Sequence, residues 1–284
     1  MNSSSASYTV VLNESNSVNE STYTYRFPNN VDFQKVQVAL SDISLYYSWR
    51  SITSEYSNNK FSFTFPASGT TINTFNITLP DGTYSAADLN NYLQWYCIQN
   101  NLYLINSSTG DYRYFVTIQE NAAQYAIEFL SYPVPTSLPS GYTAPSGWPG
   151  FPTSATRPQL IINNAGFGQI IGFNNGTYPS TAIGTSPFSK TSDFVPQLSP
   201  VQSVIILLDA VSNPFAANSG VIGTINSKGV QYGSLISYSA PEYSWSPCQG
   251  IRNELTLRFV DQLFRPLKLI DTNLTIRLLL RITN

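Results

Sequence analysis

The residues of this chain that could perform acid–base chemistry are carboxylates, because the sequence contains no histidine. The missing histidine excludes Ser-His-Asp and Cys-His catalysis and every zinc site with a histidine ligand. A glycosidase would need two carboxylates facing each other across a cleft, one of them with a raised pKa. The acidic residues of the C-terminal third available for such a pair are Asp209, Glu242, Glu254, Asp261 and Asp271. None lies in a recognisable motif, so we interpret them as strand-end and turn residues and predict no catalytic residue and no enzyme activity.

Two further kinds of chemistry have weak signals. The glycines of residues 166–176 superficially suggest a phosphate-binding loop, but no Walker lysine and no βαβ pattern accompany them. The acidic spacing of a calcium loop is also missing from the sequence. We therefore predict no metal site and no cofactor.

Cys97 and Cys248 are the only cysteines, too few for a disulfide framework. We favour free, buried thiols, while a single bridge between the two stays open. Cys97 has no Lys or Arg close to it in sequence that would make its thiol reactive, so we interpret it as a core residue.

The composition favours self-association. Charged residues make up 11% of the chain, against about a quarter in an average soluble protein. The net charge of −2 gives weak repulsion between copies, and 14 Lys and Arg against 16 Asp and Glu leave no basic footprint for nucleic acid. No apolar run approaches the ~20 residues of a membrane span, and the first residues lack the regions of a signal peptide. We expect a soluble protein that assembles inside a cell, without direct nucleic-acid binding.

The elements that must position these residues are mostly strands. Period-two alternation and Tyr/Val/Thr-rich runs predict strands in residues 8–12, 22–27, 36–49, 61–65, 75–79, 102–105, 112–119, 125–129, 201–209, 230–238, 243–245, 255–259 and 274–280. One helix is predicted over residues 85–100, where Ser85 and Asp88 resemble a capping box. Many short strands and a single helix point to an all-β sandwich.

A segment dense in proline and glycine, residues 131–158, interrupts the strand pattern. Such a segment cannot form the interior of a sheet, so we predict a long surface loop. Its aromatic residues Tyr142, Trp148 and Phe151 have two interpretations of equal weight. They pin the loop to its own domain, or they contact a neighbouring subunit or a receptor.

Several stretches, taken in order, make a narrower match. They are residues 38–50 (VALSDISLYYSWR), 79–85 (LPDGTYS) leading into Asp88-Leu89-Asn90, 167–173 (FGQIIGF), 176–179 (GTYP), 193–201 (DFVPQLSPV), and Asp261-Gln262 with Pro266-Leu267. This succession resembles the penton (minor capsid) proteins of virophages and polinton-like viruses, from about residue 20 to the end of the chain.

The resemblance implies a single jelly-roll β-sandwich, five copies of which close each vertex of an icosahedral shell. The partners it implies are the other copies of a homopentamer and a double-jelly-roll major capsid protein, with a host receptor as a further candidate. The implied location is the capsid vertex of the virion. We place the jelly-roll core in residues 1–79 and 195–284, and an inserted, loop-rich region with the one helix in residues 80–194.

Two other functions remain as alternatives. A carbohydrate- or receptor-binding β-sandwich would present a platform of coplanar aromatic rings on one sheet face. A histidine-free glycosidase would bring two of the carboxylates together in a cleft.

Overall fold

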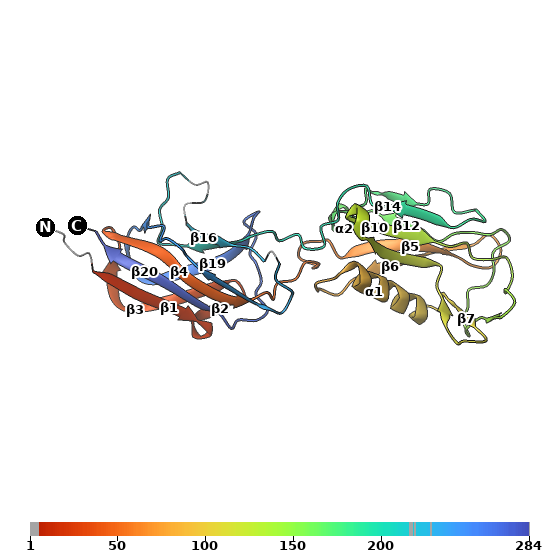
Figure 1. The fold of residues 1–284 in the computed structure, drawn as a ribbon, viewed down its shortest axis with the longest axis horizontal. Coiled ribbons are helices and arrows are strands. Elements are labelled where there is room, and N and C mark those ends of the chain that lie inside the picture. The colour runs from red at the N-terminus through yellow and green to blue at the C-terminus, as the bar shows by residue number, and fades with distance from the viewer. Residues whose placement is uncertain (1–5, 216–217, 219, 228, 284) are drawn as a thin grey trace. The chain divides into compact units, whose positions relative to one another are not determined.

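The computed structural model describes residues 6–215, 218, 220–227 and 229–283 (Figure 1). The chain divides into two compact units. The first unit consists of Met1–Trp49 together with Val201–Asn284, and the second consists of Arg50–Pro200. The first unit is therefore built from both ends of the chain, and the second from its middle.

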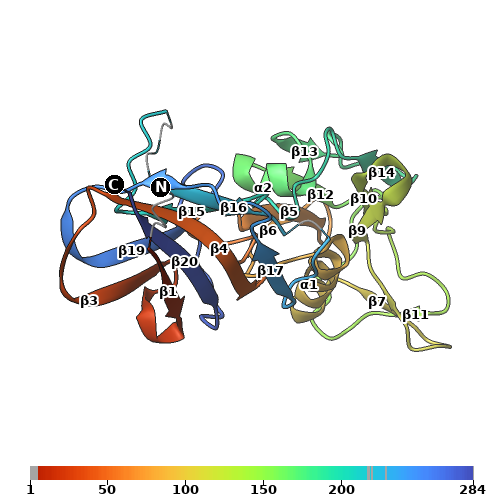
Figure 2. The same ribbon diagram turned by 60° about the vertical axis from the view of Figure 1, so that its left-hand side comes forward.

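The first unit contains two antiparallel sheets. The strands of sheet A are, in spatial order, β1 (Ser7–Asn13), β20 (Thr275–Ile282), β4 (Val36–Tyr46) and β17 (Leu235–Ser239), and the short β18 (Ser246–Pro247) also pairs with β4. The strands of sheet B are β16 (Val221–Ile225), β15 (Val204–Leu208), β19 (Ile251–Asp261), β3 (Thr22–Asp32) and β2 (Ser17–Asn19). Figure 2 shows β1, β20 and β4 side by side in sheet A.

The strand order of the first unit is that of a jelly roll. Leaving out the short β2 and β18 and counting the other strands along the chain, sheet A has the order 1-8-3-6 and sheet B the order 5-4-7-2. Eight antiparallel strands in two sheets with this alternating use of the chain form two interlocked Greek keys. The expectation of an all-β jelly-roll sandwich is confirmed.

Alternation of side chains builds the core between these two sheets. In β20 the buried residues Ile276, Leu278 and Leu280 alternate with residues on the outer face. Leu255, Leu257 and Phe259 do the same in β19, and the ring of Tyr23 from β3 meets that of Phe259 edge-on at 5.8 Å. This period of two is the pattern that predicts half-buried strands from sequence.

The second unit has its own sheets. A four-stranded sheet has the order β13 (Gly176–Tyr178), β12 (Gln159–Ile162), β5 (Lys60–Pro66) and β6 (Ile72–Thr78). Two three-stranded sheets have the orders β14 (Phe188–Thr191), β10 (Ala126–Ser131), β9 (Val116–Asn121), and β11 (Tyr142–Thr143), β7 (Leu104–Asn106), β8 (Tyr112–Arg113). Two helices, α1 (Ala86–Gln99) and α2 (Ala165–Ile171), and the single turns η1 (Glu14–Asn16, in the first unit) and η2 (Ala122–Gln124) complete the chain.

Helix α1 begins and ends as predicted. The Ser85 hydroxyl accepts the N–H of Asp88, and the Asp88 carboxylate accepts the N–H of Ser85. Leu89, Leu93 and Cys97 form its buried face, at the spacing of one helical stripe. The helix packs on β9.

The compact units divide at Arg50, whereas the expected domain boundary lies at residue 79. Strands β5 and β6 lie in the second unit, which begins at Arg50. Phe61, Phe63 and Phe65 of β5 pack into the core of that unit, and Phe61 stacks on Phe167 of α2 at 4.6 Å. Strand β5 is also buried on both faces rather than one, since all its residues from Phe61 to Pro66 are buried.

The inserted region holds more regular structure than predicted. Helix α2 is not among the predicted elements. Asn164 caps it by accepting the N–H of Phe167, and Phe167, Ile170 and Ile171 form its buried side. Residues 243–245 form no strand and precede β18. Strand β16 was missed, because Gly223 and short flanking turns weaken its β pattern.

Candidate functional site

The two thiols are free and buried, as expected. Burial raises the pKa of Cys97 to about 12, and burial likewise raises the pKa of Cys248 to about 12. A thiol must ionise to act as a nucleophile, so both residues act as small core residues.

Four of the five candidate carboxylates have structural partners. Asp209 pairs with Arg252 at 3.0 Å and accepts the N–H of Thr256 at 2.9 Å. Glu254 pairs with the exposed Arg26 on the neighbouring strand, at 3.4 Å.

Asp271 accepts the N–H of Asn273 at 2.9 Å, a local turn contact, and Glu242 is exposed. These contacts match the interpretation of strand-end and turn residues.

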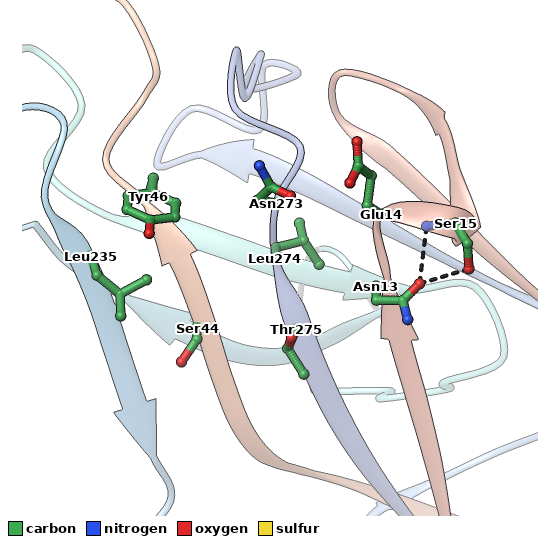
Figure 3. Close-up of a pocket in the computed structure, with 9 residues that line it drawn as sticks. All are labelled: Asn13, Glu14, Ser15, Ser44, Tyr46, Leu235, Asn273, Leu274 and Thr275. Carbon is green, nitrogen blue, oxygen red and sulfur yellow. Dashed lines mark hydrogen bonds between the residues drawn. The ribbon is translucent and has the colours of Figure 1, made fainter.

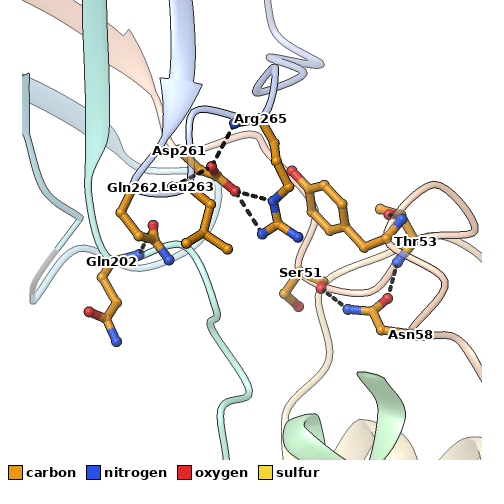
Figure 4. Close-up of polar contacts among 9 residues, drawn as sticks. Ser51, Thr53, Asn58, Gln202, Asp261, Gln262, Leu263 and Arg265 are labelled. Atoms are coloured by element: carbon orange, nitrogen blue, oxygen red, sulfur yellow. Dashed lines mark hydrogen bonds and ion pairs between the residues drawn. The ribbon is translucent and has the colours of Figure 1, made fainter. Parts of the chain in front are cut away.

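Asp261 is the most buried of these carboxylates and organises a tight turn (Figure 4). One oxygen accepts the N–H groups of Leu263 and Arg265, and the other accepts two bonds from the Arg265 guanidinium. Beside it, the Gln262 side chain accepts the N–H of Gln202 at 3.1 Å. Asp261 therefore fixes the turn that ends β19. Gln262 holds Gln202, close to the point where the chain returns from the second unit to the first.

The same figure shows the corresponding entry into the second unit. Asn58 accepts the N–H of Thr53 at 2.8 Å and donates to the carbonyl of Ser51 at 3.0 Å (Figure 4). The buried side-chain amide of Asn58 therefore closes the loop that follows residues 38–50.

The glycines of residues 167–173 allow neighbouring backbone segments to pack closely against them. A Cβ on Gly168 would lie 2.6 Å from the carbonyl oxygen of Phe173, and a Cβ on Gly172 would collide with the carbonyl oxygen of Phe194. Gly172 also has φ +80°, which only glycine adopts at little cost. The phosphate-loop interpretation, rejected from sequence, finds no support in this helix of seven residues.

Two of the sequence motifs meet at Gly172. Its carbonyl accepts the N–H groups of Asp193 and Phe194 at 2.7 and 3.1 Å. The Asp193 carboxylate accepts the N–H of Asn174 and an ion pair from Lys190 at 2.6 Å. Burial opposes ionisation of Asp193, but Lys190 and the N–H of Asn174 outweigh it and lower the pKa. Backbone hydrogen bonds therefore hold residues 167–173 and 193–198 together as one fixed connection, which is called the joint below.

The aromatic residues of the predicted loop pack against their own unit. Trp148 lies edge-on to Phe65 at 5.7 Å and 5.5 Å from Phe151, and the Arg113 guanidinium lies 5.4 Å from the ring of Tyr142. These contacts support the interpretation that Tyr142, Trp148 and Phe151 pin the loop. Contact with another molecule stays a prediction.

The aromatic rings nearest this loop do not form a flat platform. Tyr103 and Tyr112 are tilted by 42°, and Tyr112 and Tyr114 by 85°. Sugar-binding platforms of the predicted kind need coplanar rings, so this cluster does not supply one.

A groove crosses the outer face of sheet A near the ends of its strands. It has a volume of about 530 Å³. Figure 3 shows Ser44 and Thr275 between Leu235 on one side and Asn13 on the other. A second hollow of about 400 Å³ shares Tyr46 and Asn273 with it. Nothing in the amino-acid pattern predicts this groove beyond the hydroxyl residues Ser44 and Thr275 at outward positions of β4 and β20.

The described residues contain no group of three or more Cys, Asp or Glu that could hold a metal ion. No helix within residues 6–215, 218, 220–227 and 229–283 is long and apolar enough to cross a membrane.

Comparisons with known proteins give the following. No family model and no curated protein matches the chain. Among solved structures, it is similar to the mavirus penton protein, with a TM-score of 0.45 and 11% identity over 99% of each chain. It is also similar to a chain of the Sputnik virophage structure, with a TM-score of 0.41 and 9% identity over 98% of each chain. A penton protein is the class that the sequence motifs resemble.

Proposed function

We propose that this chain is a structural capsid protein that forms the pentameric vertex of an icosahedral virus. Five copies would close each vertex and contact a double-jelly-roll major capsid protein around them. Assembly would take place inside the host cell, and the mature location would be the virion. The alternating use of strands from both ends of the chain, which makes the first unit a jelly roll, is the observation that carries this proposal.

The jelly roll narrows the choice of function because this arrangement recurs in viral capsid, lectin and cupin domains. Cupin chemistry relies on metal ligands, and the described residues bring no group of candidate ligands together. The capsid and lectin functions remain, and the ordered motifs in the sequence favour the capsid.

Those motifs lie where a shell protein needs rigidity. Residues 38–50 are β4 and its exit from the first unit, and Asp261 fixes the turn after β19. Residues 167–173 and 193–198 form the joint around Gly172. A protein held by neighbours on several sides benefits from such fixed connections, because each loose connection adds an entropic cost to assembly.

Low charge is the second support. A closed ring of identical copies uses heterologous contacts, in which one patch meets a different patch on the next copy. With only 11% charged residues, such contacts bring few like charges together.

The test is cryo-electron microscopy of shells formed with and without this chain. Co-expression with a double-jelly-roll major capsid protein should give shells whose vertices carry five copies of this jelly roll. Shells of the major capsid protein alone are the control and should have open vertices. Density for this chain on the facets, or shells with empty vertices despite abundant soluble protein, would contradict the proposal.

A carbohydrate-binding module is the second candidate, and the groove on sheet A favours it. Tyr46 and Leu235 offer apolar surface, while Asn13, Ser44 and Thr275 offer hydrogen-bonding groups. Glycan-array binding that is lost on Tyr46→Ala would support this function. An array without any bound glycan would leave the groove as a surface feature of the capsid protein.

A further inference from the structure

The two edges of sheet A lack the features that normally prevent edge strands from pairing. Strand β1 has seven residues and β17 has five, and neither contains a charged residue, proline or glycine. Both pair with their inner neighbours without a register shift. Natural sheets usually blunt their edges with charges, prolines, bulges or very short strands, because a free edge is a template for another strand.

Sheet B of the same unit has such protection. Its edge strand β2 has three residues and a register shift against β3. Its other edge, β16, contains Gly223 and a register shift against β15. The edges of sheet B are thus protected and those of sheet A are not, which indicates that the edges of sheet A are available to pair with another strand.

The free backbone groups of β1 can be assigned to named residues. Just beyond the ladder, the N–H of Ile282 donates to the carbonyl of Ala6. Because backbone groups alternate along an antiparallel pair, Tyr8, Val10 and Leu12 direct theirs toward β20. Ser7, Thr9 and Val11 therefore direct their N–H and C=O groups away from the sheet.

The same reasoning applies to β17. The N–H of Ala240 donates to Ser41 of β4, so the even-numbered residues face β4 and Leu235, Ser237 and Ser239 face outward. In the part of the chain that the structure describes, no hydrogen bond reaches the outward backbone groups of Ser7, Thr9 and Val11 or those of β17. The outward N–H of Asn13, at the end of β1, already donates to the side chain of Asn16.

We propose that β1 of one copy pairs with β17 of the next copy, so that the A sheets of a ring continue into one another. This inference rests on the proposed pentamer and names the contact that builds it. Three antiparallel steps separate β1 from β17 within the sheet, so the two strands run in opposite directions. Copies related by rotation about an axis along the strands therefore meet in an antiparallel junction.

The register of this junction is fixed by the residues available. Only one antiparallel alignment uses all the outward residues whose backbone N–H groups are free, and it joins Val11 to Leu235, Thr9 to Ser237 and Ser7 to Ser239. It brings together two exposed apolar side chains, 43% and 50% accessible, and matches hydroxyl residues to one another. Matched cross-strand pairs of this kind stabilise antiparallel strands. The junction is heterologous, as a closed ring requires.

Disulfide cross-linking tests the junction. Directly opposite residues of an antiparallel pair have Cα atoms about 5.5 Å apart, within the range of a disulfide. Shells containing a variant with both Val11→Cys and Leu235→Cys should give, on oxidation, a ladder that ends at five linked chains. The native Cys97 and Cys248 are buried and should stay unlinked. Each single variant is the control and should give no linked chains.

A proline variant provides the second measurement. Val11→Pro removes an outward N–H without removing a bond to β20, so the subunit should fold while its occupancy of vertices falls at least tenfold. Val11→Ala keeps the N–H and should assemble normally. Occupied vertices without any cross-link, and with normal assembly of Val11→Pro, overturn the junction but leave the vertex function standing. Linked pairs from Val11→Cys alone overturn it in favour of a two-fold contact. Vertices empty of the unmodified chain overturn both.

Discussion

The Arg265 guanidinium donates a hydrogen bond of 2.7 Å from Nε to one oxygen of the fully buried Asp261, and its Nη2 forms an ion pair with the same oxygen at 2.7 Å. The other oxygen accepts two backbone N–H groups of the same turn. A buried carboxylate with this many donors is fully satisfied, which is the condition for burying a charge at acceptable cost.

Asp261→Ala should destabilise the first unit by about 2–3 kcal/mol, because it leaves buried N–H groups without acceptors. Glu254→Ala is the control: its pair with Arg26 is exposed and should contribute less than about 0.5 kcal/mol. Urea unfolding followed by tryptophan fluorescence measures both. Equal midpoints for the two variants would show that the turn does not hold β19.

The cap of α1 predicts a response to acid. The hydroxyl and the backbone N–H of Ser85 hold the pKa of Asp88 below its usual value. Because the folded-state pKa is the lower one, ionised Asp88 stabilises the helix above about pH 4. This contribution is lost as the pH falls through the lowered value.

The unfolding midpoint of the second unit should therefore fall less with acid in Asp88→Asn than in the unmodified chain. Ser85→Ala should cost about 1 kcal/mol at neutral pH. Thermal unfolding followed by circular dichroism across the acid range measures both variants. Identical acid responses in Asp88→Asn and the unmodified chain would contradict the role of the cap.

Gly172 offers a test of the joint between residues 167–173 and 193–198. Gly172→Ala adds a Cβ against the carbonyl oxygen of Phe194 at a positive φ, so it should cost more than about 2 kcal/mol. Gly110→Ala has nearly the same φ, +78°, but open space around the new Cβ. It should cost only the backbone strain, about 1 kcal/mol. Unfolding midpoints of the two variants compare the packing contribution directly.

The loop of residues 131–158 should depend on Trp148. Trp148→Ala removes a ring packed against Phe65, Phe115 and Phe151 and should cost about 2–3 kcal/mol. It should also make the loop susceptible to limited proteolysis. Tyr125→Ala, at an aromatic residue that is 80% exposed, should change neither property. Unaltered proteolysis of Trp148→Ala would favour a contact with another molecule as the main role of this ring.

The sequence predicted the elements whose patterns are local. The capping pair of Ser85 and Asp88 and the alternation in residues 274–280 each specify an element without reference to the rest of the chain. The division of the chain at Arg50 was not predicted, because the apolar and polar residues of 61–65 alternate in a way that fits a strand of either unit. Local alternation cannot say which strand pairs with which.

The candidate surfaces were harder to predict for a related reason. The joint at Gly172 joins segments about twenty residues apart through backbone groups, which leave no side-chain pattern. The groove on sheet A is lined by residues from β1, β4, β17 and β20, at opposite ends of the sequence. The contacts of Asp209, Asp261 and Asp271 agree with their interpretation as strand-end and turn residues, which residue type and turn context had suggested.

The division of the jelly roll between the two ends of the chain has a consequence for synthesis on the ribosome. Apart from the pairing of the short β2 with β3, no two strands of residues 7–46 pair with each other. Those strands must wait until residues 204–282 emerge, while the second unit between them can already form its core. Domains generally fold as units during synthesis. The nascent chain therefore spends the translation time of the whole insertion with strands that lack their partners, among them the uncharged β1. This is the period in which a chaperone would be of most use.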